Sequence, residues 1–173
     1  MREHARLIGG IHHEPVTQQT IARRVLLRLV SFGEGRADTR RQQQVHALHS
    51  AADDDGEFRR VLQRLVDTRL VTVDGDDGVD DALADLSHEA LIEAWPVFQE
   101  WIERRRADEQ RRRWLEAKVR EWLARGRGKR GGLDLVELSE AERWIQGDAA
   151  RELGYEPELP LLLAASRGEI ENL

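Results

Sequence analysis

Apolar residues recur at helical spacing in the first part of the chain and predict two helices there. Residues 17–32 carry an apolar face that predicts a helix, which Gly33 is expected to end. Residues 57–68 carry a second face, formed by Phe58, Val61, Leu62 and Leu65, and follow aspartates that are typical N-caps. Between these segments, residues 39–45 are polar and extended in character, and residues 45–50 predict a short helix.

The pattern changes to that of a hairpin after residue 68. Residues 70–73 are rich in β-branched side chains, residues 74–78 contain only aspartate and glycine, and residues 82–86 lead back. The order helix, strand, helix, helix, hairpin is that of a winged helix, with residues 57–68 in the recognition-helix position. We therefore predict a mainly α fold: a winged helix with a small β-hairpin wing, followed by a helical bundle or arm.

The chain after residue 88 is predicted to be almost wholly helical. Pro96 predicts a kink or restart, a further helix spans residues 107–124, and the glycine-rich residues 126–132 end it. Ser139 and Glu142 form a capping-box pattern, and a last helix begins near residue 158. The expected domains are an N-terminal linker (1–16), a winged helix ending in the long helix after His88 (17–104) and a helical extension (105–173).

Composition narrows the class of protein. The chain has 173 residues, 40% hydrophobic and 35% charged, which fits a folded helical protein. The absence of cysteine excludes disulfides, thiolate metal ligands and a cysteine nucleophile. With neither a bilayer-length apolar run nor a signal peptide, we expect no membrane association and a cytoplasmic location.

The formal net charge of −6 is unevenly distributed. Residues 103–130 contain twelve Lys and Arg against five Asp and Glu, a balance of +7, so the remainder carries −13. The acidic balance of the winged-helix region argues against general binding to a phosphate backbone. Acidic residues also interrupt the arginine clusters 104–106 and 111–113, which we interpret as a solvated helix face. Nucleic acid is therefore an unlikely partner.

His88 is the most informative single residue. It lies where the predicted hairpin leads into a helix, and the first turn of a helix favours anions through its free N–H groups and its dipole. His88-Glu89 also begins a His-Glu-x-x-His zinc pattern, but Ile92 occupies the place of the second histidine, so no metal site is expected. From the residues alone, a helix-capping or packing role for His88 remains the alternative.

The sequence around His88 resembles a known regulatory element. Residues 86–96, followed by Trp101-Ile102-Glu103, are similar to the segment that joins the winged helix to the helical region in bacterial novel STAND NTPases. His88 takes the histidine place and Glu89 the acidic place of the Met-His-Asp element of STAND nucleotide-switch ATPases, with Ser87 at the methionine place. The resemblance extends over most of the chain, through residues 24–41, 58–71, 111–122 and 138–144.

This resemblance implies a switch without its catalytic half. In the family the histidine reaches the β-phosphate of bound ADP and helps to hold the protein off, so His88 is expected to contact ADP only together with a P-loop NTPase domain. The Walker A lysine and Walker B aspartate are missing, so we expect no enzyme activity and no cofactor in this chain alone; ADP or ATP with Mg²⁺ would belong to the parent protein. Arg40, Arg41 and Glu89 are expected interface residues, and a sensor such as a WD-repeat propeller is a second expected partner.

A second interpretation belongs to a different class of function. A free-standing winged helix could instead be a protein-interaction module, or could bind DNA through its recognition helix. The residues that would touch DNA are Arg59, Arg60, Arg64 and Arg69. Aspartates 53–55 and the acidic wing, residues 74–81, are poorly placed for phosphate contact, which makes this the weaker interpretation.

Overall fold

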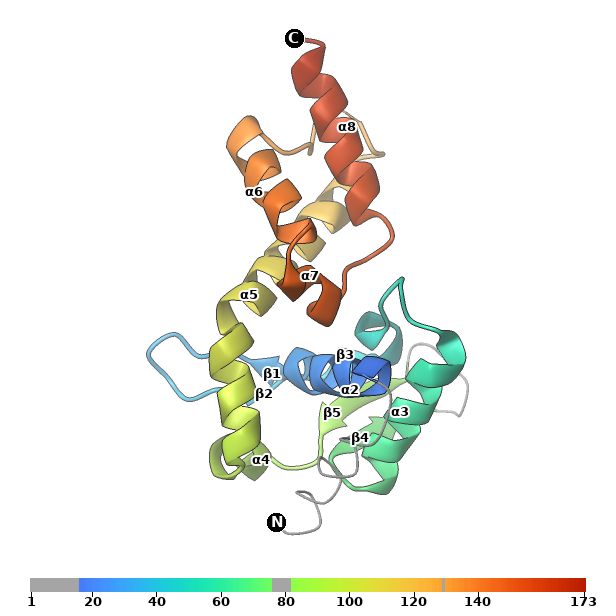
Figure 1. Ribbon diagram of the computed structural model, residues 1–173, viewed down its shortest axis with the longest axis vertical. Coiled ribbons are helices and arrows are strands. Elements are labelled where there is room, and N and C mark those ends of the chain that lie inside the picture. Colours follow the sequence, from blue (N-terminus) through green and yellow to red (C-terminus); the bar gives the residue numbers. More distant parts are fainter. Residues whose placement is uncertain (1–15, 76–81, 129) are drawn as a thin grey trace. The chain divides into compact units, whose positions relative to one another are not determined.

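The computed structural model describes residues 16–75, 82–128 and 130–173, which belong to two compact units, Met1–Arg106 and Ala107–Leu173 (Figure 1). The fold is mainly helical with two small antiparallel sheets, which confirms the predicted mainly α class with a small β-hairpin. Within the described ranges, no helix is long and apolar enough to cross a bilayer.

The elements of the first unit follow the predicted order of helix, strand, short helix, helix and hairpin. They are α2 (Val16–Arg28), β1 (Val30–Ser31), β2 (Thr39–Arg40), β3 (Gln43–Gln44), the 3₁₀ helix η1 (Val45–Leu48), α3 (Asp55–Asp67), β4 (Val71–Asp74) and β5 (Leu83–Leu86). Strand β5 lies between β3 and β4 and is antiparallel to both, with Val71 opposite Leu86. The tip of the predicted wing, residues 76–81, lies outside the described residues.

The first predicted helix is shorter than expected. Helix α2 ends at Arg28 rather than at Gly33, because Val30 pairs with Arg40 in the β1–β2 ladder. Gly33 serves the turn of that ladder instead. A Cβ atom on Gly33 would lie 2.3 Å from the Arg36 carbonyl oxygen, so only glycine fits without a shift of the backbone. The polar segment 39–45, predicted to be extended, contributes β2 to one sheet and β3 to the other, and η1 begins at Val45.

Helix α3 forms where its caps and its apolar face predict it. The Asp54 carboxylate accepts a hydrogen bond from the Glu57 backbone N–H at the first turn. Of the predicted inner face, Phe58, Val61 and Leu65 are buried and Leu62 is half-buried. This face packs against α2, which lies beside α3.

The C-terminus of α3 closes on a left-handed residue. Arg69 has φ = 61°, and its N–H donates to the Val66 carbonyl at 3.0 Å. The next N–H, that of Leu70, donates to the Leu65 carbonyl at 3.0 Å. These two bonds form the Schellman pattern, in which glycine is preferred at the position that Arg69 occupies.

We expect Arg69→Gly to raise the free energy of unfolding by about 0.5–1 kcal/mol, because glycine adopts a left-handed conformation without Cβ strain. Urea denaturation measures this change. Arg59→Gly, in the middle of α3, is the matched control and should lower the free energy of unfolding by about 1 kcal/mol. Destabilisation by both variants would contradict the assignment of Arg69 to a left-handed position where glycine is preferred.

The segment after β5 forms two helices, α4 (Ala90–Ala94) and α5 (Pro96–Ala124). The restart at Pro96 is confirmed, because Trp95 is extended, with φ = −110° and ψ = 99°. The predicted new helix at residue 107 is wrong, since α5 continues through that point. No glycine or proline lies between residues 97 and 124, and ion pairs one turn apart, such as Arg104 with Glu100, support the continuous helix.

The second unit contains the rest of α5 with α6 (Leu135–Ile145), α7 (Asp148–Leu153) and α8 (Leu159–Glu171). The capping box predicted at Ser139 is wrong. The box lies at Asp134, whose carboxylate accepts from the Glu137 N–H while the Glu137 carboxylate accepts from the Asp134 N–H. Ser139 is already inside α6 and donates to the Leu135 carbonyl at 2.9 Å. The core of this unit is apolar and includes Leu115, Val119, Trp122, Leu133, Leu138, Leu159 and Leu162.

Glu156 is a half-buried carboxyl in the loop between α7 and α8. Burial raises its pKa above the usual range, and repulsion from Glu116 adds to the shift, while Arg112 and Arg120 oppose it. A carboxyl with a raised pKa in the folded state binds its proton more tightly there. Its contribution therefore favours folding at low pH and is lost as the pH rises through the folded-state pKa.

We expect Glu156→Gln to stabilise the protein at pH 7 and to leave its stability nearly unchanged at pH 4, where the wild-type carboxyl is more often protonated. Urea unfolding of both proteins at the two pH values tests this. An equal change in stability at pH 4 and pH 7 would contradict the raised pKa of Glu156 as the cause.

Candidate functional site

His88 lies in a short connection between β5 and α4, as predicted. The backbone is held on both sides of it: the Ser87 N–H donates to the Leu70 carbonyl at 3.0 Å, and the His88 carbonyl accepts from the Leu91 N–H at 3.2 Å. The side chain of His88 is exposed, and no hydrogen bond or ion pair joins it to another of the described residues. The connection therefore presents the imidazole at the surface from a fixed backbone.

The expected help from a helix dipole at His88 is wrong. Helix α4 has only five residues, and its first helical residue is Ala90. Such a short helix aligns few peptide dipoles, so an anion at His88 would depend on the imidazole itself. Glu89 is exposed at the N-cap position of α4, and its side chain makes no capping hydrogen bond. Both side chains thus remain available to a partner.

Ser87, at the methionine place of the predicted element, points inward. Its Oγ atom is buried and has no hydrogen-bond partner among the described residues. Methionine would fill such a position with an apolar side chain, whereas serine places a hydroxyl there at a cost in desolvation. The departure from the family pattern thus leaves a buried hydroxyl next to His88 in the chain.

The structure brings Arg40 to the same connection, although 48 residues separate it from His88 in the sequence. Its Nη1 atom donates to the Leu86 carbonyl at 3.3 Å and lies 3.7 Å from Asp85 Oδ2. Arg40 therefore joins β2 to the end of β5, just before His88. Its side chain is 41% exposed, so it can also contact a partner.

Arg41, the other predicted interface arginine, is held differently. Its backbone N–H donates to the Leu29 carbonyl at 2.8 Å, and the residue is half-buried. The described contacts do not join it to the His88 connection. Of the two arginines, the structure thus associates only Arg40 with the predicted site.

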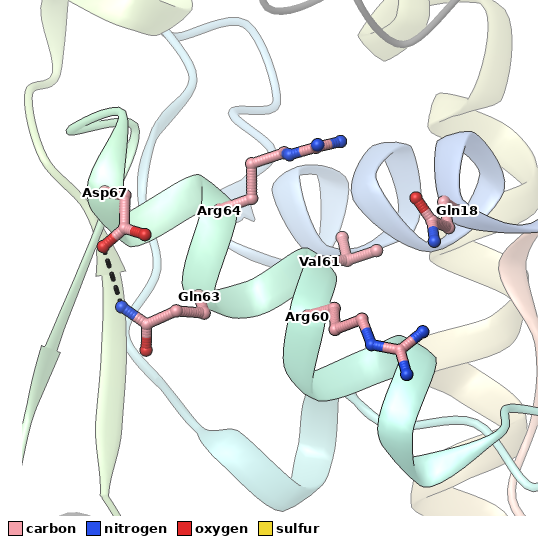
Figure 2. A pocket seen from close by; sticks show the side chains of 6 residues that line it. All are labelled: Gln18, Arg60, Val61, Gln63, Arg64 and Asp67. Carbon is pink, nitrogen blue, oxygen red and sulfur yellow. Dashed lines mark hydrogen bonds between the residues drawn. The ribbon is translucent and has the colours of Figure 1, made fainter. Parts of the chain in front are cut away.

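The predicted DNA-binding arginines are all exposed on or after α3. Two of them line a hollow between α2 and α3, with a volume of about 330 Å³ (Figure 2). Its lining consists of Gln18, Arg60, Val61, Gln63, Arg64 and Asp67. In Figure 2 the side chains of Arg60 and Arg64 extend from the same side of α3.

Charges around this hollow are partly neutralised within the protein. Arg60 lies 2.6 Å from a Glu57 carboxylate oxygen, and Gln18 donates a hydrogen bond to the same carboxylate. Gln63 donates to Asp67 at 2.8 Å (Figure 2). Because carboxylates lie beside the arginines on this face, the field that a DNA phosphate would meet is weak.

Some charged groups that look exposed in the sequence are instead buried. Arg112, in a cluster interpreted as a solvated face, has a side chain only 5% exposed and pairs with Glu109, which is fully buried. Arg24 forms a similar buried pair with Asp53. The spacing of Glu109, Arg112 and Glu116 along one helix face was a signal for the first pair, because residues three and four apart meet on a helix. No local signal marked the second.

Metal-binding side chains do not gather in the described part of the chain. No group of three or more histidine or carboxylate residues there is arranged to hold a metal ion. His49 instead lies 2.9 Å from the Asp55 carboxylate and packs its ring edge-on against Phe58, with centroids 5.0 Å apart. At the His88 connection, the side chains of His88, Glu89 and Arg40 offer hydrogen bonding and charge pairing.

The chain matches the model of a known protein family. The family model described as Novel STAND NTPase 1 matches residues 11–130, which are 120 of the 173 residues. The match includes α2, the hairpin, the His88 connection and all of α5. Comparisons with curated proteins and with solved structures found no match.

Proposed function

Because the chain belongs to the Novel STAND NTPase 1 family, we propose that it is a regulatory, non-catalytic module of a nucleotide-switch ATPase. Residues 17–104 would be its winged-helix domain, ending in the long helix after His88, which the element order and the β3–β5–β4 sheet support. Residues 105–173 would be the helical arm. Its partner would be a P-loop NTPase domain, and a sensor such as a WD-repeat propeller would act on the arm.

The observation that carries the proposal is the state of His88. Its imidazole is exposed and forms no hydrogen bond or ion pair with the described residues, while the backbone on both sides is hydrogen-bonded. A ring Nδ1–H or Nε2–H can donate to a phosphate oxygen without first breaking an internal bond. His88 is therefore suited to contact the β-phosphate of ADP held by the partner domain.

The phosphates of the nucleotide would supply hydrogen-bond acceptors for the His88 ring. In the ADP state, His88 would donate to the β-phosphate and keep the module against the NTPase domain, the off state. Arg40 and Glu89 lie close to His88 in the chain or in space and would contact the same partner through charge pairing. Exchange for ATP with Mg²⁺ would favour the state in which this contact is lost, because a ligand shifts a two-state protein toward the state that it binds better. The module would act in the cytoplasm of a bacterium.

We expect His88→Ala to weaken binding of the chain to the ADP-loaded NTPase domain roughly 10- to 100-fold, the range of one hydrogen bond to a charged group. Isothermal titration calorimetry measures the two affinities. His46→Ala, an exposed histidine on η1, is the matched control and should bind as the wild type does. In the full-length parent, His88→Ala should also release ADP faster and produce signalling without a stimulus.

Two results would contradict the role of His88. One is an unchanged affinity of the His88→Ala variant for the ADP-loaded domain. The other is equal loss of affinity in the His88→Ala and His46→Ala variants, which would indicate a nonspecific effect.

A further inference from the structure

Two charged residues in or next to the short strand β2 contact different parts of the first unit. The carboxylate of Asp38, which directly precedes β2, accepts two hydrogen bonds from Arg106 of α5, at 2.8 Å (Nη1 to Oδ1) and 2.7 Å (Nη2 to Oδ2). Arg40, two residues later, donates to the Leu86 carbonyl at the end of β5. The segment 38–40 thus joins α5 to the strand that leads directly into His88.

The contact between Asp38 and Arg106 is partly buried and is supported by further interactions. The side chains are 13% and 26% exposed, and the Gly33 N–H adds a third hydrogen bond to the carboxylate at 2.9 Å. The guanidinium also lies over the Phe32 ring, 5.1 Å from its centroid. Hydrogen bonding to Arg106 lowers the pKa of Asp38, so the pair is charged at neutral pH. Two parallel bonds fix orientation as well as distance.

The chain itself also connects His88 to Arg106. From His88 the chain runs through α4 and Trp95 into α5, which reaches Arg106 after three turns. Trp95, Phe98 and Trp101 are buried and pack together, with centroid distances of 5.5 Å for Trp95 and Phe98 and 6.1 Å for Trp95 and Trp101. Buried aromatic side chains therefore hold the start of α5. The segment that carries His88 is thus connected to α5 in two ways, directly along the chain and through the segment 38–40.

From these contacts we propose that Asp38, Arg40 and Arg106 form a relay that makes the placement of His88 depend on the position of α5. A force on α5 that separates Arg106 from Asp38 frees the segment 38–40. Arg40 then loses its hold on the Leu86 carbonyl, and the connection that carries His88 changes conformation. Arg40 and Arg106 are positioning residues, since they act on His88 through the backbone of β5.

The inference rests on the proposed function for its biological meaning: α5 continues beyond Arg106 into the second unit, so the relay would carry the state of the arm to the switch histidine. The contacts that form the relay all lie within this chain, so they can be tested without a partner.

Nuclear magnetic resonance of the whole chain tests the relay without any partner. The probes are the His88 ring signals and the exchange rate of the Ser87 amide, whose hydrogen bond to Leu70 lies beside the Arg40 contact. Arg106→Gln and Arg40→Gln should each shift the His88 ring signals, in the same direction, and speed exchange of the Ser87 amide roughly three- to tenfold. The double variant should shift the signals no further than the larger single effect, because both substitutions break one path.

Arg104→Gln is the matched control. Arg104 lies on the same helix and pairs with Glu100 one turn away, outside the relay. This variant should leave the His88 signals in place. A milder substitution, Arg106→Lys, keeps the charge but removes the two parallel bonds, so it reports on the relay even if Arg106→Gln unfolds the unit; it should give a smaller shift in the same direction.

The outcomes separate the relay from the proposed function. His88 signals that stay unchanged in both Arg106 variants, or effects of Arg106→Gln and Arg40→Gln that simply add, would overturn the relay. Neither result depends on nucleotide or on an NTPase domain. Failure of the His88→Ala binding test would instead remove the proposed function and leave the NMR result intact.

Discussion

Replacement of Asp53 by alanine is expected to lower the free energy of unfolding by about 3–5 kcal/mol, the usual cost of removing one partner from a buried ion pair. Asp53 pairs with Arg24 of α2, and the two side chains are 6% and 3% exposed. The same carboxylate accepts from the Ser50 N–H at 2.8 Å and so holds the segment before α3. The substitution leaves a buried guanidinium without its carboxylate. Urea denaturation followed by circular dichroism measures the change.

Asp55→Ala is the control for this prediction. Asp55 is 83% exposed and its carboxylate lies 2.9 Å from His49, so its loss should cost less than about 1 kcal/mol. If Asp53→Ala is no more destabilising than Asp55→Ala, the pair with Arg24 is not the anchor between α2 and α3.

Two neighbouring arginines of α5 are expected to differ strongly in their effect on stability. Arg112→Met should cost about 3–5 kcal/mol, because it leaves the fully buried Glu109 without its main partner. Arg112 donates to both oxygens of Glu109 at 2.7–3.0 Å and to Glu116 at 2.6 Å. Arg113 also lies 3.1 Å from Glu109, so the Glu109 carboxylate keeps one charged partner in the Arg112→Met variant. Urea denaturation compares the variants.

Arg111→Met provides the matched comparison from the same arginine triplet. Arg111 is 39% exposed, and its partner Glu140 is 45% exposed at 3.1 Å. Exposed pairs of this kind contribute about 0–1 kcal/mol, so this variant should remain close to the wild type. Equal losses in the free energy of unfolding for the Arg111 and Arg112 variants would show that the buried pair contributes no more to stability than the exposed one.

Local patterns predicted those parts of the fold that local physics determines. The inner face of α3, its aspartate cap and the restart at Pro96 each follow from spacing or from one residue's backbone chemistry, and all are present. The early end of α2 depends on the pairing of Val30 with Arg40, a contact between residues far apart in the sequence. The capping box was misplaced because Asp134–Glu137 and Ser139–Glu142 have the same spacing, and only packing distinguishes them.

The sequence predicted part of the candidate site as well. The position of His88 between a strand and a helix was predicted from the sequence and is confirmed, but the expected helix support is not present, since α4 is so short. Arg40 was singled out as an interface residue, while its contact with the Leu86 carbonyl depends on how β2 and β5 come together. Buried pairs such as Arg24 with Asp53 were missed because charge patterns indicate exposure by default.

The measurement that tests the central claim most directly is the affinity of the wild-type chain for its P-loop NTPase domain, loaded in turn with ADP and with a non-hydrolysable ATP analogue. Isothermal titration calorimetry of the two complexes gives the ratio. If the chain holds the ADP-bound off state, the ADP complex should be at least about tenfold tighter, the factor of about 1.4 kcal/mol that one contact to phosphate readily supplies. Equal affinities in the two nucleotide states, or no binding in either, would contradict the account.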